Sequence, residues 1–170
     1  MNIRKLKPQD AASFQRLRLL GLRDEPSAFA SSHEEEQDRP LSAIEAQLAP
    51  SLDHAIFGAF ANDELVGVVA LGREGMHKLA HKGYIWGMFV ASSSRQQGLG
   101  RLLMLEAIAT ARNVPGMRQL NLGVNANNSA AIRLYESLGF QAFGREAGAM
   151  LVDGTLHDEL HMSLRLEKVN

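Results

Sequence analysis

The pattern of hydrophobic and polar positions predicts an alternation of strands and helices along the whole chain. Two apolar runs, 54–61 and 64–73, flank Asn62-Asp63, which is typical of a tight β-hairpin turn. Similar apolar runs bounded by polar or glycine-containing segments predict the other strands. The complete set of expected strands is 2–7 (ended by Pro8), 54–61, 64–73, 84–91, 118–124, 141–147 and 155–166, the last two joined around Asp153-Gly154.

Apolar residues at helical spacing fill several segments between these strands. Asp10 is suited to cap a helix that runs to about Leu22, and Gly139 is suited to end one that begins near Ser129. The stretch 27–50 is expected to be helical or irregular, and 73–82 to be a flexible connection. Residues expected to share one face are Phe14, Leu17, Leu20 and Gly21 in the first helix, and Leu102, Leu105 and Ala109 in a helix over 99–112.

The composition is that of one ordinary folded domain covering residues 1–170. Of the 170 residues, 45% are hydrophobic and 22% are charged, and the net charge is −1. This balance gives no overall attraction to nucleic acid or to a membrane surface. The absence of cysteine excludes disulfides, a thiolate metal site and a cysteine nucleophile. We see no signal-peptide core and no membrane-spanning run, so we expect a cytoplasmic protein.

The most specific chemistry lies in Arg95-Gln96-Gln97-Gly98-Leu99-Gly100-Arg101, between an apolar strand and an amphipathic helix. Free N–H groups at a helix N-terminus, together with the helix dipole, form an anion site. Gly98 and Gly100 allow close approach of a diphosphate because neither carries a Cβ, and Arg95 and Arg101 add positive charge. An ordinary strand–turn–helix connection is the alternative interpretation.

Arg95-x-x-Gly98-x-Gly100 resembles the pyrophosphate-binding signature of the GNAT superfamily of acyl-CoA N-acyltransferases. A second block, from Asn128 to Phe140, is similar to the same family's Asn-x-x-Ala-x-x-Leu-Tyr-x-x-x-Gly-Phe element. The resemblance is sharp over residues 84–140 and general elsewhere. It implies an α/β (α+β) single domain with a twisted, mostly antiparallel mixed sheet flanked by helices. That sheet should be splayed between the strand at 84–91 and the strand at 118–124.

The resemblance also implies acetyl-CoA as co-substrate and a set of residues that bind it. Gly87 suits a β-bulge that turns the backbone toward the thioester, and the strand residues after it would pair with the pantetheine amides. Tyr135 would protonate the departing thiolate, although a core tyrosine would fit the same periodicity. The implied binding residues are Met88, Phe89, Val90, Arg95, Gln96, Gln97, Gly98, Leu99, Gly100, Arg101, Asn128 and Tyr135, and Asn128 would serve equally as a helix cap.

The general base is not evident, because Tyr84 to Val90 contains no carboxylate, although many family members carry a glutamate on this strand. The remaining candidates are Glu34, Glu35, Glu36, His81 or a water relay. Residues 22–50, 73–82 and 144–156 are expected to line the acceptor pocket. Phe29, Trp86 and the acidic run favour a cationic amine with an apolar portion.

His157 and His161 have the spacing of metal ligands on a helix, but the surrounding residues alternate with the period of a strand. We therefore expect no metal there. The predicted function is transfer of an acetyl group from acetyl-CoA to a primary amine of a small molecule or peptide, by a monomer or homodimer. Two alternatives stay open. One is a coenzyme A-binding sensor or subunit without turnover, and the other is an unrelated nucleotide binder, which the missing third glycine and P-loop lysine disfavour.

Overall fold

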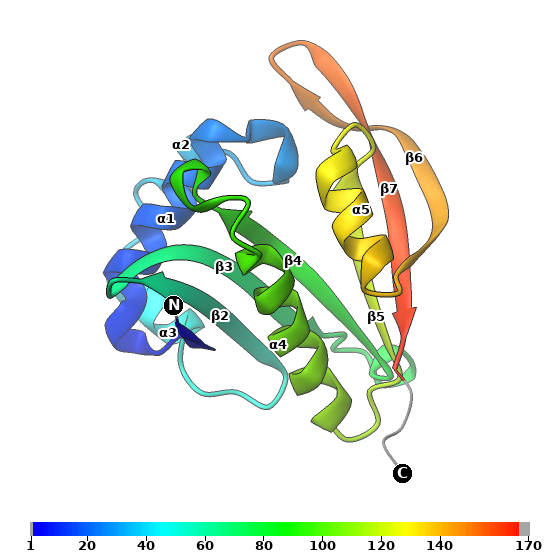
Figure 1. Ribbon diagram of the computed structural model, residues 1–170, viewed down its shortest axis with the longest axis horizontal. Helices are drawn as coiled ribbons and strands as arrows, with labels where there is room; N and C mark the ends of the chain where they lie inside the picture. The colour runs from blue at the N-terminus through cyan, green and yellow to red at the C-terminus, as the bar shows by residue number, and fades with distance from the viewer. Residues whose placement is uncertain (1, 167–170) are drawn as a thin grey trace.

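The computed structural model describes residues 2–166. Figure 1 shows a sheet with helices on both of its faces. The strands are β1 (Asn2–Lys5), β2 (His54–Ala61), β3 (Glu64–Arg73), β4 (Lys82–Val90), β5 (Gln119–Asn125), β6 (Gln141–Val152) and β7 (Thr155–Arg165). The helices are α1 (Ala11–Asp24), α2 (His33–Glu36), α3 (Leu41–Gln47), α4 (Leu99–Asn113) and α5 (Ser129–Ser137), with short 3₁₀ turns η1 (Pro8–Asp10), η2 (Pro26–Ala28), η3 (His77–Leu79) and η4 (Ser92–Ser94).

The strands form one mixed sheet in the order β1-β2-β3-β4-β5-β7-β6. Every neighbouring pair is antiparallel except β4 and β5, which are parallel because α4 connects them across the sheet. The hairpin turn at Asn62-Asp63 is confirmed, since both residues have positive φ angles (49° and 64°) as a type I′ turn requires. The fold class expected from the sequence is therefore confirmed.

The sheet opens between β4 and β5. Within the described residues, these strands are paired only where Lys82–Tyr84 meets Gln119–Asn121. Beyond Tyr84 the two strands diverge, and each continues against its other neighbour. Figure 1 shows the resulting wedge, closed at one end and open at the other, so the predicted splay is confirmed.

Two hydrophobic clusters lie on opposite faces of the sheet. One joins α1 and α3 to β2, β3 and β4, and the other joins α4 and α5 to β2, β3, β4, β5 and β7. Strand β3 is buried from Leu65 to Leu71 because both of its faces are covered.

The face of α4 that carries Leu102, Leu105 and Ala109 is not the face that packs on the sheet. Leu102, Leu105 and Ala109 are exposed, and the buried stripe is Leu99, Leu103, Met104, Ala107, Ile108 and Ala111. The helix carries apolar residues on two stripes, and the larger one packs on the sheet. The assignment of Phe14, Leu17 and Gly21 to the inner face of α1 is confirmed, with Leu20 partly buried.

The C-terminal hairpin is longer than expected, because β6 continues through 148–152 instead of ending at residue 147. Its pairing with β7 is irregular between Glu146 and Met150. Asp158 bridges the irregularity by accepting hydrogen bonds from the Gly148 N–H (2.9 Å) and from Arg145 (2.7 Å). These bonds hold the pKa of Asp158 below its usual value. These hydrogen bonds also explain why the polar residue Asp158 occupies a position of β7 at which the alternating pattern otherwise places apolar residues.

In the portion of the chain that the structure describes, the helices lack the combination of length and hydropathy needed to cross a bilayer.

Candidate functional site

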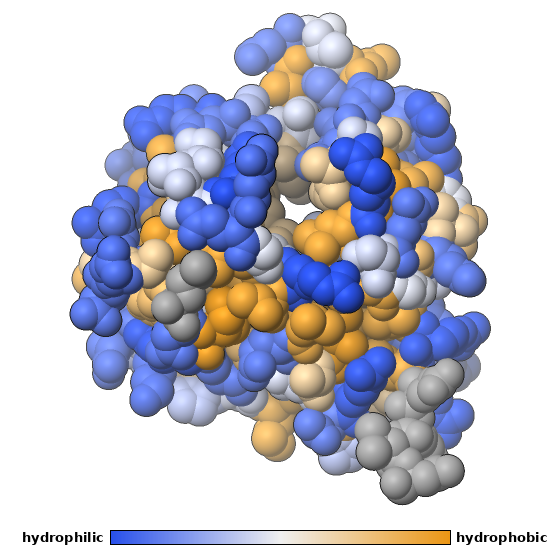
Figure 2. Space-filling view, in the orientation of Figure 1, coloured by the Kyte–Doolittle hydropathy of each residue, from blue (hydrophilic) through white to orange (hydrophobic). Residues whose placement is uncertain are grey.

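The splay holds a cavity of about 740 Å³, which we call the larger cavity. Figure 2 shows the surface hollowed between the start of α4 and α5. Its lining includes ten of the twelve predicted binding residues: Met88, Phe89, Val90, Arg95, Gln96, Gly98, Leu99, Gly100, Arg101 and Asn128. Gln97 is exposed and outside the lining, and Tyr135 lies behind it in the core. The geometry thus brings together residues from β4, the loop before α4, and α5.

The loop before α4 is shaped for an anion. Gln96 and Gly98 both adopt left-handed backbone conformations, with φ angles of 62° and 75°. The first backbone hydrogen bond that closes α4 runs from the Leu102 N–H to the Gly98 carbonyl (3.1 Å). The N–H groups of the first helical turn therefore remain available to a ligand, at the positive end of the helix dipole.

The two glycines of this loop differ in what surrounds them. A Cβ at Gly98 would meet nothing within 4 Å, so only its positive φ favours glycine. A Cβ at Gly100 would lie 3.0 Å from Met88 Cε and 3.4 Å from Leu134 Cδ2, both in the cavity wall. Gly100 therefore keeps the mouth of the larger cavity open.

Both arginines of the motif are held at the rim by side-chain contacts. Arg95 donates to the Val90 carbonyl (3.0 Å) and forms an ion pair with Glu25 (2.9 Å). Arg101 donates to the Ser137 hydroxyl (2.9 Å). Both arginines thus line the larger cavity with defined hydrogen-bond partners.

The opposite wall contains residues that sequence reasoning missed. Asn125, at the end of β5, donates to the Ser27 carbonyl (3.2 Å) and lies 3.3 Å from His157 Nδ1. Asn128 caps α5 by accepting from the Ala131 N–H (3.1 Å), and it also lines the larger cavity. A signal was present for Asn125, because it begins a polar segment just where an apolar strand ends.

Tyr135 is 6% exposed, and its ring packs 6.0 Å from that of Phe140. Burial raises the pKa of Tyr135 to about 12, because the phenolate would lose its hydration. The residue before it, Leu134, lines the larger cavity. Tyr135 therefore keeps its proton at neutral pH in an apolar environment next to the cavity.

A second, smaller cavity of about 430 Å³ adjoins the first, and Ala28 and Phe29 line both. Arg18 crosses it and donates two hydrogen bonds to Glu36, from Nε (3.1 Å) and Nη2 (2.9 Å). Glu159 on β7 contributes a carboxylate from the other side of the splay. The remaining lining is Phe14, Ala30, Ser31, Arg39, Gln47, Ile85, Trp86, Gly87 and Gly123.

The bulge predicted at Gly87 separates the two cavities. Its φ angle is 62°, and the pairing of β4 with β3 shifts by one residue there, between Val68 and Ala70. Met88, directly after the bulge, lines the larger cavity, whereas Gly87 lines the smaller one. The bulge is therefore the point at which ligands in the two cavities would meet.

The structure narrows the candidates for the base. Glu34 and Glu35 are exposed and outside both cavities, and Glu35 caps α2 through the Ser32 N–H (2.7 Å). Burial tends to raise the pKa of Glu36, but the hydrogen bond and charge of Arg18 outweigh it and lower the pKa overall. His81 precedes the closed end of the splay and lines neither cavity. Glu159, which no sequence pattern singled out, is the carboxylate in the smaller cavity without an arginine partner among the described residues.

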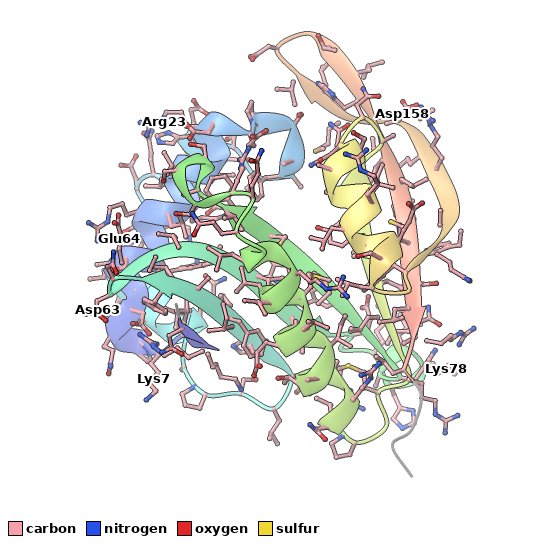
Figure 3. The ribbon with its side chains drawn as sticks, in the orientation of Figure 1. Lys7, Arg23, Asp63, Glu64, Lys78 and Asp158 are labelled. Carbon is pink, nitrogen blue, oxygen red and sulfur yellow. The ribbon has the colours of Figure 1, made fainter. Side chains whose placement is uncertain are left out.

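The three segments expected to line the acceptor pocket differ in whether they reach the smaller cavity. Residues 73–82 and 144–156 contribute nothing to the smaller cavity. Lys78 marks the first segment in Figure 3 and lies at the closed end of the sheet, away from Asp158 at the other end. The second segment belongs to the β6–β7 hairpin and its irregularity. From the segment 22–50, residues 28–31, 36, 39 and 47 line the smaller cavity.

His157 and His161 lie on strand β7, as the alternating pattern predicts. His157 lines the larger cavity, whereas His161 is paired with Glu146 and Glu159 (3.4 and 3.7 Å). Residues 2–166 contain no group of three or more histidine, aspartate or glutamate side chains arranged to hold a metal ion.

Comparison with known proteins agrees with this geometry. The sequence profile of the "Acetyltransferase (GNAT) family" matches residues 19–140. The mycothiol acetyltransferase of Thermobispora bispora is 45% identical over 58 residues, which are 34% of this chain and 19% of that protein. The chain spans only 24% and 19% of the length of the curated relatives that it matches.

Solved structures share the fold over nearly the whole chain. A GNAT-family acetyltransferase from Streptococcus pneumoniae superposes with a TM-score of 0.87 and 25% identity, covering 98% of this chain and 99% of that one. A putative acetyltransferase from Salmonella typhimurium, solved with its cofactor acetyl-CoA, gives a TM-score of 0.82 and 23% identity, covering 100% and 96%. The profile match covers well over half of the sequence. The chain therefore belongs to the GNAT acetyltransferase family.

Proposed function

We propose that this protein transfers an acetyl group from acetyl-CoA to a primary amine by direct attack of the amine on the thioester. The observation that carries the proposal is the adjacency of the two cavities, which share Ala28 and Phe29 in their linings. The lining of the larger one includes the N-terminus of α4, and that of the smaller one includes the Glu159 carboxylate, with the Gly87 bulge between them. A structure of the same fold has been solved with acetyl-CoA, which supports this assignment of the larger cavity.

In the proposed complex, the pyrophosphate lies at the start of α4, between Arg95 and Arg101. The pantetheine arm follows the unpaired edge of β4. Its amide groups form hydrogen bonds with the backbone of the segment Met88–Val90. The arm would act as an added strand in the open part of the sheet. Asn128 contacts the coenzyme from α5.

The acceptor amine enters through the smaller cavity. Glu159, directly or through one water, takes the proton that an ammonium group must lose before it can attack. The amine nitrogen then forms a bond to the thioester carbon while the carbon–sulfur bond breaks. Backbone N–H groups near Phe89 stabilise the oxyanion that develops on the carbonyl oxygen.

Tyr135 assists departure of the sulfur in this proposal. A thiol has a pKa near 8.5, whereas the pKa of Tyr135 is raised to about 12. Complete proton transfer from this tyrosine to the thiolate would thus be uphill by roughly 5 kcal/mol. We therefore expect Tyr135 to stabilise the developing thiolate by donating a hydrogen bond, while the thiolate takes its proton, directly or through water, from the attacking nitrogen as that nitrogen becomes the amide.

The proposal is tested by mixing the protein with acetyl-CoA and a panel of amines and measuring release of free thiol. The chain contains no cysteine, so a thiol reagent reports coenzyme A without background from the protein. Amine-dependent thiol release with a matching acetylated product is expected. Tight coenzyme A binding with no release for any amine would instead identify a sensor or subunit.

A further inference from the structure

Arg18 is an unusual residue for its position. It lies on the inner face of α1, between Phe14 and Leu17 on one side and Gly21 on the other, and it is 9% exposed. Glu36 compensates its charge through two hydrogen bonds, and the guanidinium also stacks 4.7 Å from the ring centroid of Phe29. A buried arginine held this firmly is suited to recognition rather than to surface solubility.

One of its donors has no partner. Nη1 of Arg18 is fully enclosed and makes no hydrogen bond with any residue in the range 2–166. Leaving a buried charged donor unsatisfied is costly, so this N–H group is suited to an oxygen supplied by a ligand. A Cβ built at Gly87 would have Nη1 as its nearest neighbour, at 3.7 Å. The donor therefore lies beside the β4 bulge, and Arg18 and Gly87 both line the smaller cavity.

The position of Nη1 constrains the ligand. If the amine attacks the thioester at the bulge, as proposed above, both the reacting nitrogen and the oxygen bound by Nη1 lie beside Gly87. Such an acceptor needs an oxygen only a few bonds from its amine. A lysine side chain does not meet this condition, because its amine is five carbons from the nearest carbonyl. Phe29 and Trp86 provide an apolar wall for the rest of the molecule.

We propose that Arg18 Nη1 binds the carbonyl or carboxylate oxygen of an α-amino carbonyl unit, with its amine directed toward Glu159 and the bulge. This assignment of the acceptor class rests on the proposed function. The unit has two sources, a free amino acid and the N-terminal residue of a peptide. Glu36 is a positioning residue here, because it fixes the guanidinium and does not itself contact the oxygen.

The test uses two acceptors that differ only in the carboxamide, leucinamide and 3-methylbutylamine, in the thiol-release assay. Their amines have different pKa values, so the informative quantity is how a variant changes the ratio of their kcat/KM values. In Arg18→Met/Glu36→Met, both partners become apolar and no buried charge is left unpaired. We expect this variant to lower the leucinamide preference at least tenfold, and Arg16→Met, an exposed position on the same helix, to leave it unchanged.

Leucine and a peptide with N-terminal leucine distinguish the two sources of the unit. If the double variant lowers kcat/KM equally for leucinamide and for 3-methylbutylamine, the proposal is overturned, because Arg18 would then serve the acetyl group or the fold.

If no amine supports thiol release, the proposed function fails, and calorimetry on the coenzyme A-loaded protein decides the inference separately. Leucinamide should bind at least tenfold more tightly than 3-methylbutylamine, and lose that advantage in the double variant. Equal affinities in the parent protein would contradict the inference.

Discussion

At the scale of single residues, the environment of each ionisable group determines its role. Two glutamates line the smaller cavity, yet they differ in their surroundings. Glu36 is neutralised by Arg18, which lowers its pKa and makes it a weak proton acceptor. Glu159 has no such partner in the described chain and stands over Gly123, where any Cβ would collide with its carboxylate. Glycine at this point of β5 thus makes room for the proposed base.

Glu159→Gln should lower turnover about a hundredfold near neutral pH, because the variant cannot accept the proton of the ammonium group. The loss should shrink as pH rises, since the amine then deprotonates without help. The check is kcat/KM as a function of pH, with Glu34→Gln as the control, because Glu34 is exposed and outside both cavities. A Glu159→Gln profile parallel to that of the parent protein would exclude Glu159 as the base.

Tyr135→Phe keeps the packing against Phe140 and removes the hydroxyl. Turnover should fall by roughly one to three decades while coenzyme affinity stays almost constant, because the hydrogen bond to sulfur forms mainly in the transition state. Presteady-state measurement of the chemical step is the appropriate test. If the variant is as fast as the parent in that step, Tyr135 is a core residue only.

The raised pKa of Tyr135 also predicts a dependence of stability on pH. The folded state favours the neutral phenol of Tyr135. The contribution of this phenol to the free energy of unfolding is therefore complete below pH 10 and is lost as the pH rises toward 12. Its full size is of the order of 3 kcal/mol. Denaturant unfolding at pH 9 and pH 11 should show a smaller alkaline loss for Tyr135→Phe than for the parent. Equal losses would mean that the phenol does not resist ionisation in the folded state.

At the scale of elements, local patterns could be recognised in the sequence and long-range ones could not. The turn at Asn62-Asp63 and the loop before α4 depend on adjacent residues, so the sequence alone predicted both. Arg18 and Glu159 line one cavity only because α1 and β7 approach it from opposite sides of the splay. For Arg18 a signal existed, namely a charge within the apolar stripe of a helix. Two stripes of α4 are apolar, so the sequence alone does not tell which of them packs on the sheet.

Gly100→Val should raise the dissociation constant of acetyl-CoA at least tenfold, or about 1.4 kcal/mol. The added side chain would press against Met88 and Leu134 and fill the space next to the helix N-terminus. Gly144→Val is the matched control. A Cβ at Gly144 meets nothing within 4 Å, and Gly144 lies outside both cavities. Calorimetric titration measures the effect, and a folded Gly100→Val protein with parental affinity would refute the assignment of the loop.

At the scale of the whole molecule, the sheet is two antiparallel half-sheets joined along a short parallel ladder. A ligand that fills the larger cavity contacts β4 on one side and α5 on the other. Binding energy is therefore added to the contact between the halves, where the protein alone has few backbone hydrogen bonds.

Coenzyme A at a hundred times its dissociation constant should stabilise the folded state by about 2.7 kcal/mol. For a chain of this length, that corresponds to a rise in melting temperature of roughly 5–10 °C. Adenosine 3′,5′-bisphosphate, which lacks the pantetheine arm and the pyrophosphate, should give a smaller rise at the same concentration. The same rise for both compounds would show that the arm does not bridge the splay.

The division of the sheet coincides with a division of the chain. Residues 2–113 supply β1 to β4 and α4, and residues 119–165 supply β5 to β7 and α5. The covalent link between the halves is the short crossover at 114–118, in which Pro115 and Gly116 are exposed. A cut between these two residues would yield two complementary fragments whose shared interface contains the coenzyme site. Fused to the halves of a reporter, such fragments should reassemble more tightly in the presence of coenzyme A, so that the reporter signal measures the coenzyme.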